Sequence, residues 1–238
     1  MRFFSIVILL CSLALTPCFT SSALAEAGLK DVVATVERGY NSLSDLQASF
    51  VQKTFIASVK RDQTGNGTVS IRKNPSGAAM FRFDYRKPKQ LIVSDGKTVW
   101  FYLPENRQVM QSSVRNMFEG DNGIALNYLT GMGRISRDFT ISPMKGLRDS
   151  AGNYLLELVP KKPGRNLAKL HLTVSAEAVA KYLKDGNVKN IFPIVSSVVF
   201  DPFGTKTTIL FSNVKVNRGL KRSLFSFKTP AGVEVVKP

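Results

Sequence analysis

The chain has 238 residues, with 33 lysines and arginines against 17 acidic residues, which gives a formal net charge of +16. The two cysteines, Cys11 and Cys18, both lie in the first 25 residues. The remaining ~200 residues therefore cannot rely on disulfides, and they are numerous enough to build an ordinary hydrophobic core in one domain.

The first 25 residues have the pattern of a cleavable secretory signal. Arg2 begins a short basic region, an almost continuous apolar run extends from Phe3 to Leu15, and Ala23-Leu24-Ala25 offers the small residues of a cleavage site. A lipoprotein anchor fits less well, because the cysteines follow a leucine and a proline. No later segment approaches the ~20 unbroken apolar residues that span a bilayer. We expect residues 1–25 to be a signal peptide and residues 26–238 to form a single exported domain.

The exported part of the chain is strongly basic. Without Arg2, 32 basic residues remain against 17 acidic ones. Such a surplus favours anionic partners. For an exported protein these are a phospholipid surface, an acidic polymer or a negatively charged protein rather than nucleic acid. A lysine-rich surface that only contacts solvent is an equal alternative.

A helix and a strand are the first elements expected after the signal. Apolar residues recur at spacings of three and four from Leu29 to Leu43, which predicts an amphipathic helix packed on a core. Residues 46–53 follow as a strand. The sequence then becomes polar between Phe55 and Asn66, and Gly65-Asn66-Gly67 predicts a turn.

The clearest strand signal runs from Thr68 to Met110. Phe81, Phe83 and Tyr85 alternate with polar residues, so they share one face of a strand. An Asp95-Gly96 pair between two apolar runs predicts a two-residue hairpin loop, in which position 92 faces position 99. One face of this hairpin then carries Ile92, Val99 and Phe101, and the other carries Leu91, Val93, Trp100 and Tyr102. Since both faces are apolar, helices, another sheet or an apolar ligand must cover the second.

Strand patterns dominate the rest of the chain. A turn is expected at residues 104–106 and a strand at 107–111. The apolar residues at 117–129 are then spaced as in a helix, and Gly131-Met132-Gly133 would form its C-terminal cap. Strands are expected at residues 139–141, 154–159, 170–174, 195–200, 207–214 and 224–227. One or two helical turns should lie at residues 176–183, and Asp201-Pro202-Phe203-Gly204 should form a hairpin turn. About ten strands with few helices between neighbours predict a mainly antiparallel sheet.

The sequence offers no pattern for catalysis. The only histidine, His171, lies on the polar face of a strand with no second ligand at metal-binding spacing. Catalytic triads, phosphate loops and dinucleotide fingerprints are absent, so we expect no enzyme and no cofactor. A glycosidase-type carboxylate pair remains open. The excess of apolar strand residues, which include Phe211, Phe225 and Phe227, fits an ordinary core or, better, a cavity enclosed by a curved sheet.

Three blocks of the sequence resemble the outer-membrane lipoprotein carrier proteins (LolA). The first is residues 46–53, from Leu46 to Lys53. The second and densest runs from Gly67 to Tyr102 and contains Phe81-Arg82-Phe83, Pro88 and the run from Ile92 onward. The third is the ending at residues 225–235. The order of the blocks and the total length agree with the family, so the resemblance covers nearly all of residues 26–238.

The resemblance implies a fold and a role. The fold would be an incomplete, strongly curved antiparallel β-barrel of about ten to eleven strands, with a few helices covering its open apolar side. The protein would be a monomeric periplasmic carrier that shields the acyl chains of lipoproteins. It would receive them from an ATP-driven inner-membrane transporter and pass them to an acceptor lipoprotein at the outer membrane. An acyl chain of about 15 methylenes costs roughly 12 kcal/mol to expose to water, so such cargo needs shielding.

The resemblance also implies site residues. The expected lid helices contribute Val33, Val36, Leu126 and Leu129. Family members place an arginine directly before a proline to tie the lid closed, and this chain has Arg72-Lys73-Asn74-Pro75 there. Arg72 or Lys73 is therefore the candidate latch. Acyl-chain or partner contacts are expected at Phe50, Phe81, Phe83, Tyr85, Val93, Trp100, Phe101 and Tyr102.

Two questions stay open at this point. The segment at residues 176–192 is longer than a hairpin connection needs, and it adds either a lid element or a surface loop. The same architecture would also suit a carrier or sensor of another lipid, such as a glycolipid or an envelope-stress signal, because a fold does not fix its cargo.

Overall fold

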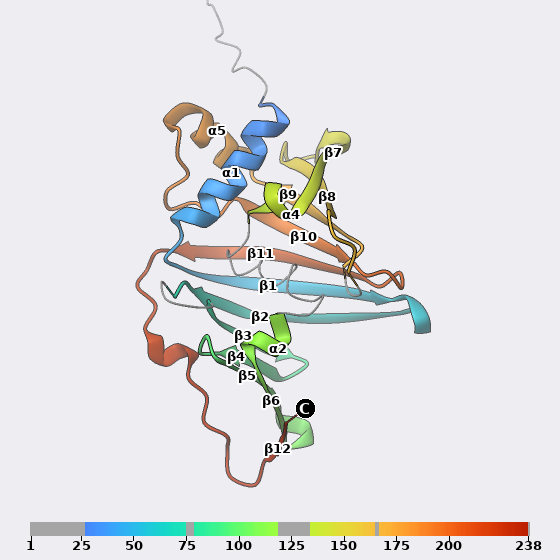
Figure 1. Cartoon of the computed structure of the whole chain (residues 1–238), viewed down its shortest axis with the longest axis vertical. Coiled ribbons are helices and arrows are strands. Elements are labelled where there is room, and N and C mark those ends of the chain that lie inside the picture. Colours follow the sequence, from blue (N-terminus) through green and yellow to red (C-terminus); the bar gives the residue numbers. More distant parts are fainter. Residues whose placement is uncertain (1–26, 75–78, 119–133, 165–166, 238) are drawn as a thin grey trace, which may run out of the picture.

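The computed structural model describes residues 27–74, 79–118, 134–164 and 167–237. They form one twelve-stranded sheet with the strand order β12-β6-β5-β4-β3-β2-β1-β11-β10-β9-β8-β7 (Figure 1). The strands are β1 (Asp45–Ile56), β2 (Arg61–Arg72), β3 (Met80–Lys87), β4 (Gln90–Ser94), β5 (Thr98–Leu103), β6 (Gln108–Ser113), β7 (Phe139–Arg148), β8 (Tyr154–Pro160), β9 (Lys169–Val174), β10 (Ile194–Phe200), β11 (Lys206–Val216) and β12 (Glu234–Val236). The helices are α1 (Leu29–Ser42), α2 (Val114–Phe118), α4 (Ile135–Asp138) and α5 (Ala176–Asp185), with 3-10 turns η1 (Ala57–Val59), η2 (Pro104–Asn106) and η3 (Arg222–Phe225).

The sheet consists of two meanders that meet in its middle. Strands β1 to β6 pair in chain order, strands β7 to β11 do the same, and β1 joins β11 to unite them. All pairs are antiparallel except β12 with β6. The sheet is curved and open, because β12 and β7 lie at its two ends and do not pair with each other. The predicted mainly antiparallel, curved sheet is confirmed, with twelve strands rather than ten or eleven.

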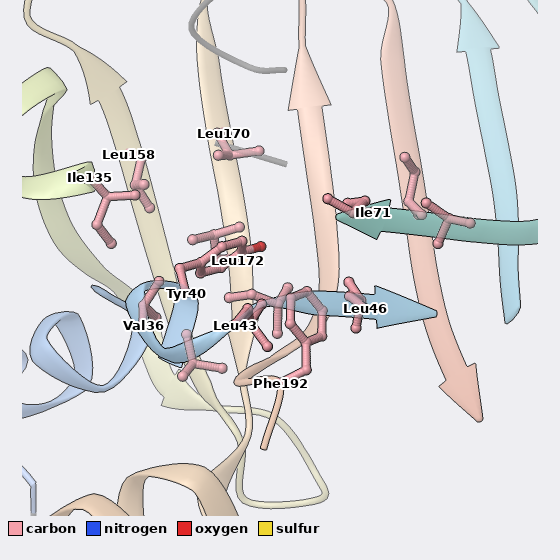
Figure 2. Close-up of a cluster of buried hydrophobic side chains, with 14 of the residues drawn as sticks. Val36, Tyr40, Leu43, Leu46, Ile71, Ile135, Leu158, Leu170, Leu172 and Phe192 are labelled. Carbon is pink, nitrogen blue, oxygen red and sulfur yellow. The ribbon is translucent and has the colours of Figure 1, made fainter. Parts of the chain in front are cut away.

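The helix expected at residues 29–43 is α1, and it covers the face of the sheet that we call the inner face. Its apolar stripe is buried at Val32, Val36 and Tyr40. They share one buried cluster with Leu158, Leu170 and Leu172 of the second meander, and this cluster continues to Leu46 and Ile71 of the first (Figure 2). The inner face therefore holds the main hydrophobic core, as expected for a sheet with one helix-covered face.

The opposite, outer face is covered in part by the end of the chain. The segment between β11 and β12 runs from the middle of the sheet to its far edge (Figure 1). Phe225 is fully buried, and the Phe227 ring lies 6.0 Å from Trp100 and 5.7 Å from Tyr102. The second apolar face of the β4–β5 hairpin is thus covered by this segment. The strand expected at residues 224–227 was wrong, because these residues include part of η3 and bond locally, with Leu224 N–H donating to Lys221 O.

The hairpin loop between β4 and β5 is longer than the sequence suggested. Leu91 faces Tyr102 and Ser94 faces Val99, which is two residues from the expected register. The cause is the Asp95 side chain, whose Oδ1 accepts hydrogen bonds from the N–H groups of residues 97 and 98, both at 2.8 Å. This side-chain bonding favours a four-residue loop over a two-residue turn. Because the shift is even, the predicted distribution of side chains between the two faces is confirmed.

The expected turn at Gly65-Asn66-Gly67 was also wrong. These residues lie inside β2, and the connection from β1 is made by η1 instead. The ends of β1 and β2 are largely solvent-exposed, so their polar composition resembled a loop. Gly67 is required by close packing, since a Cβ there would lie 2.0 Å from Asp84 O on the neighbouring strand. A register shift between β2 and β3 occurs at the same point.

The helical turns predicted near residue 176 form α5, which packs beside α1. The helix begins at Ser175, whose Oγ accepts from Ala178 N–H, and ends at Gly186 with a left-handed φ of 66°. The predicted hairpin turn at residues 201–204 is confirmed as well. The helical stretch predicted at 117–129 begins as α2, and its part from 119 onward lies outside the described residues. Among the described helices, none has the length and apolar content needed to cross a bilayer.

Candidate functional site

An aromatic cluster lines the inner face where the first meander meets the core. The register places Phe50 opposite Gly67, which in turn lies opposite Tyr85. The missing glycine side chain lets the Phe50 ring approach Tyr85 edge-on at 4.8 Å and Phe83 at 6.0 Å. Phe81 lies 6.1 Å from Phe83. Phe50 and Phe81 are buried, whereas Phe83 and Tyr85 are half-buried and form the accessible edge of the cluster.

Tyr85 gives this apolar edge one fixed polar atom. Its hydroxyl donates a 2.8 Å hydrogen bond to Gln52 Oε1. Burial raises the pKa of Tyr85, so the hydroxyl stays neutral. The cluster therefore offers apolar surface without a charge.

The space deeper in the inner face is nearly filled. A void of about 10 Å³ is lined by Leu46, Val69, Ile71, Phe83, Phe192, Ile209 and Phe211. A cavity of this size holds about one water molecule at most. A larger apolar ligand can enter between these side chains only if they, or the helix above them, move.

Two larger apolar grooves flank the N-terminal half of α1. One has a volume of about 300 Å³ and lies between α1 and β7–β8, with Leu29, Val32, Leu147 and Leu156 in its wall. The other has about 330 Å³ and is lined by Leu29, Val33, Phe139 and Ile141 together with Glu37 and Ser136. Volumes of this order are typical of the smaller ligand pockets of proteins. Helix α1 thus borders open apolar space on both sides.

Lys73 ties the C-terminal end of α1 to the end of β2. Its Nζ donates to Tyr40 O at 2.6 Å and to Asn41 O at 3.0 Å, and its backbone N–H donates to Ser44 O. The last carbonyls of a helix lack internal partners and carry the negative end of the helix dipole, so a cation suits them. Burial lowers the pKa of Lys73. The contact is therefore made by a half-buried cation.

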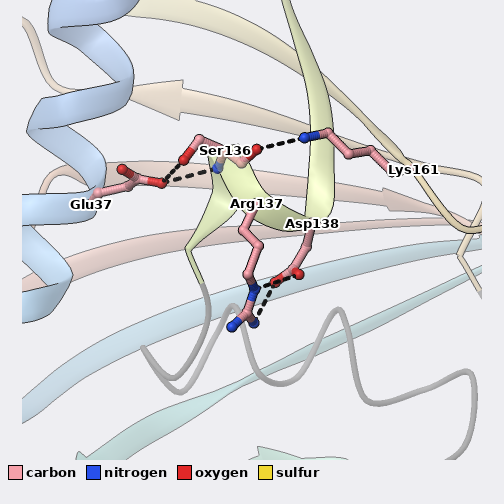
Figure 3. Close-up of polar contacts among 5 residues, drawn as sticks. All are labelled: Glu37, Ser136, Arg137, Asp138 and Lys161. Carbon is pink, nitrogen blue, oxygen red and sulfur yellow. Dashed lines mark hydrogen bonds and ion pairs between the residues drawn. The ribbon is translucent and has the colours of Figure 1, made fainter.

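Two further polar contacts hold the sides of α1. Glu37 Oε1 accepts from the Ser136 N–H at 3.0 Å and from its Oγ at 2.6 Å, and Lys161 Nζ donates to Ser136 O (Figure 3). On the other side, Arg38 donates to Gly186 O at 2.9 Å, at the end of α5. Helix α1 is thus attached by a few exposed or half-buried polar groups in addition to its apolar stripe.

Arg72, the other latch candidate, points to a different element. Its guanidinium donates to Leu220 O in the C-terminal segment. The same segment is held by Asp45, whose carboxylate accepts from the N–H groups of Arg218, Gly219 and Leu220 at 2.8, 2.8 and 3.3 Å. Arg72 and Asp45 therefore fasten the C-terminal segment. Of the two latch candidates, it is Lys73 whose side chain bonds to α1.

The structure separates the predicted contact residues into two groups. Phe50, Phe81, Phe83, Tyr85 and Phe101 share the inner face, as do Val33 and Val36 of α1 by their packing on the core. Val93, Trp100 and Tyr102 lie on the outer face, where Val93 is fully buried and Phe227 covers the two aromatic rings. Leu126 and Leu129 lie outside the described residues.

Sequence reasoning missed the polar groups that fasten the helix and the C-terminal segment. Neither Glu37, on the polar side of a helix, nor Asp45, between a helix and a strand, belongs to a recognisable sequence motif. Their partners lie about 100 and 170 residues away in the chain. No local pattern could have identified either contact.

The single histidine lies in a small polar cluster on the outer face. Glu157 Oε2 contacts His171 Nε2 at 2.9 Å and accepts from Lys169 Nζ at 2.8 Å. The hydrogen bond from Lys169, followed by the contact with His171, lowers the pKa of Glu157. Within the described residues, no group of three or more potential ligands could hold a metal ion.

The chain is similar to outer-membrane lipoprotein carrier proteins of bacteria. The family model described as outer membrane lipoprotein carrier protein LolA matches residues 41–228. An outer-membrane lipoprotein carrier protein of Neisseria meningitidis serogroup C is 28% identical over 225 residues, which cover 94% of each chain. The protein of the same name from Dechloromonas aromatica is 27% identical and covers 90% of this chain and 89% of its own.

Solved structures with similar shape are more distant. A conserved protein from Thermus thermophilus has a TM-score of 0.48 and 15% identity, with 88% of this chain and 98% of that one covered. A LolA superfamily protein from Nitrosomonas europaea has a TM-score of 0.41 and 15% identity, with coverages of 84% and 98%. The family model covers well over half of the chain, and the chain therefore belongs to the outer membrane lipoprotein carrier protein (LolA) family.

Proposed function

We propose that this protein is a periplasmic carrier that shields the acyl chains of lipoproteins and moves them from the inner to the outer membrane. The observation that carries the proposal is the apolar lining of the inner face, which continues from the aromatic cluster at Phe50 to the grooves beside α1. Family membership and relatives named as outer-membrane lipoprotein carrier proteins support it. Residues 1–25 would direct export and be removed.

The packing of the inner face suggests how acyl chains would be bound. Each buried methylene gains about 0.8 kcal/mol, so even part of an acyl chain offsets the cost of displacing a loosely held helix. Helix α1 is the described element best placed to move, because open grooves flank it and three polar contacts hold its end and sides. Displacement would extend the accessible apolar surface inward from the half-exposed edge at Phe83 and Tyr85. Lys73 would serve as the latch that family members build from an arginine.

Transfer of the lipoprotein would depend on partner proteins rather than on a reaction catalysed by this chain. An ATP-driven transporter of the inner membrane would supply the work of extracting the lipoprotein, and an acceptor lipoprotein would receive it at the outer membrane. An apolar face that is closed by a helix with only a few polar contacts would suit release without further energy input. We therefore propose a carrier without enzymatic activity and without a cofactor.

The test is release of a lipoprotein from membranes. The protein without residues 1–25 is incubated, free of detergent, with inner-membrane vesicles that contain the transporter, a tagged outer-membrane lipoprotein and ATP, and the supernatant is assayed. A soluble one-to-one complex supports the proposal. If no complex forms and native mass spectrometry of the purified protein finds a bound non-protein lipid instead, the carrier would serve another cargo.

Phe83→Glu tests the site within the same assay. A carboxylate at this half-buried position adds charge to the acyl-binding edge, so the yield of complex should fall by about tenfold or more while the fold persists. Val159→Glu is the matched control, because Val159 is 42% exposed and lies on the outer face of β8, beside the buried Leu158. Equal yields from the two variants would remove the aromatic cluster from the proposed site. Should Phe83→Glu fail to fold by circular dichroism, Phe83→Ala provides the milder comparison.

A further inference from the structure

Two turns project side by side from one end of the sheet. The β1–β2 turn contains η1, and the β10–β11 turn spans residues 201–205. They are neighbours because β1 pairs with β11, which sets Phe55 opposite Lys206. A Cβ on Gly204 would lie only 3.3 Å from the Ala57 Cβ. Figure 1 shows both turns at the right-hand end of the strands, away from α1 and α5. We call this pair of turns the apolar tip.

The apolar tip presents two large apolar side chains to solvent. Phe203 is 78% exposed and Val59 is 64% exposed, the highest values among the large apolar side chains that the structure describes. The β10–β11 turn is held firmly, since Asp201 Oδ1 accepts from the N–H groups of Phe203 at 2.9 Å and Thr205 at 2.8 Å. Phe203 is therefore held outward at the apex of a bonded turn.

Cationic side chains surround the apolar tip. Exposed basic residues at the strand ends are Lys53, Lys60, Arg61 and Lys206. The acidic residues nearby have partners, because Asp62 lies 3.2 Å from Lys53 and Asp201 bonds within its own turn. The β3–β4 hairpin also carries exposed Arg86, Lys87 and Lys89, but Lys87 lies opposite Asn66, so these cations are set back about 16 Å along β2 from Arg61. Four exposed basic residues are thus at the tip itself, and one of them, Lys53, is paired with Asp62.

We propose that the apolar tip docks on the surface of a membrane containing anionic phospholipids. Exposed apolar side chains with a ring of lysine and arginine are the features that place a peripheral protein at the headgroup boundary, where the apolar groups enter the lipid and the cations remain at the phosphates. A projecting tip inserts into such a boundary, whereas a protein partner is more often recognised by a broad surface patch. The charge complementarity selects anionic over neutral lipid.

Docking in this way would orient the inner face. Strand β1 carries Phe50 in the aromatic cluster and ends at Ile56, directly before η1. A docked tip would hold the aromatic cluster within one strand length of the membrane surface. Membrane docking is separate from the proposed cargo binding, because it needs neither lipoprotein nor an opened helix.

The test is binding of the empty protein, without residues 1–25, to vesicles. Co-sedimentation is measured with vesicles of phosphatidylethanolamine and phosphatidylglycerol and with neutral vesicles of phosphatidylcholine. We expect the wild type to bind the anionic vesicles selectively, and Val59→Ser with Phe203→Ser to weaken that binding about tenfold or more. Leu183→Ser is the apolar control, since Leu183 is 41% exposed and belongs to α5, which lies away from the tip in Figure 1.

A second pair of variants tests the charge. Neutralising Lys60, Arg61 and Lys206 to glutamine should weaken binding strongly, whereas the same change at the exposed Lys30, Lys184 and Lys189 should weaken it much less. Insertion of the tip into the lipid is measured by tryptophan fluorescence. The variant carries Phe203→Trp together with Trp100→Phe, so that its only tryptophan is at position 203. On binding, its emission should shift to the blue and be quenched by brominated lipid. Three results would each overturn the proposal: no selective binding by the wild type, equal loss in the two charge variants, or unchanged fluorescence of a bound Phe203→Trp protein.

Discussion

Replacing Lys73 by methionine should loosen helix α1 without disturbing the sheet. Methionine keeps most of the length and apolar stem of lysine but removes the ammonium that donates to Tyr40 O and Asn41 O. A cation at a helix C-terminus contributes about 0.3–2 kcal/mol. A hydrogen bond to a charged group adds about 1.5–3 kcal/mol. The desolvation that lowers the pKa of Lys73 offsets part of this gain. A net loss of about 1–2 kcal/mol is therefore expected on substitution.

Hydrogen exchange followed by mass spectrometry measures this loss locally. Amides of α1 should exchange about tenfold faster in the variant, because a tenfold change corresponds to ~1.4 kcal/mol in the opening equilibrium. Peptides from β8–β10 should change much less. Lys189→Met, at an exposed position, serves as the control. Unchanged exchange in α1 of Lys73→Met would show that apolar packing alone holds the helix, and Lys73 would then not be a latch.

Three further substitutions test other parts of the structure. Asp45→Ala leaves three backbone N–H groups without their acceptor, so the free energy of unfolding in urea should fall by about 2–4 kcal/mol, and trypsin should cleave faster in residues 218–222. Gly67→Ala places a methyl group 2.0 Å from Asp84 O, and a loss of at least about 2 kcal/mol is expected, whereas a neutral result would contradict the close strand contact. The pKa of Glu157 is depressed below its ordinary value of 4.5 by its lysine and histidine partners, so its stabilising contribution is present above that pH and is lost as the pH falls below it. The difference in stability between wild type and Glu157→Gln should accordingly shrink on acidification.

The sequence was most informative where the pattern is local. The spacing of apolar residues located α1, and alternation located most strands and assigned the correct face to Ile92 and Val93. The Asp95 loop showed the limit of such reasoning, because a side-chain hydrogen bond changed the register by two residues. Gly67 showed another limit, since the strand that requires a glycine there comes 17 residues later.

The candidate site was harder to predict than the fold. Alternation placed Phe81, Phe83 and Tyr85 on one face correctly, but it could not tell which apolar face of the sheet would be free. Trp100 and Tyr102 are covered by Phe227, which follows them by more than 120 residues. Contacts of that range depend on the path of the whole chain. Of the residues predicted to contact the ligand, only those on the inner face therefore remain in the proposed site.

The pairing of β1 with β11 bears on how the chain reaches its native state. Within each meander, neighbouring strands follow each other in the chain, and most are joined by short connections, so most strand pairs form between residues that are close in sequence. The seam between the meanders instead brings Leu46 to Val216, which closes a loop of about 170 residues. Contacts of such separation are acquired slowly. Because synthesis begins at the N-terminus, the edge of β1 that later receives β11 stays without this partner until most of the chain has been made, and during that interval other chains can add to it.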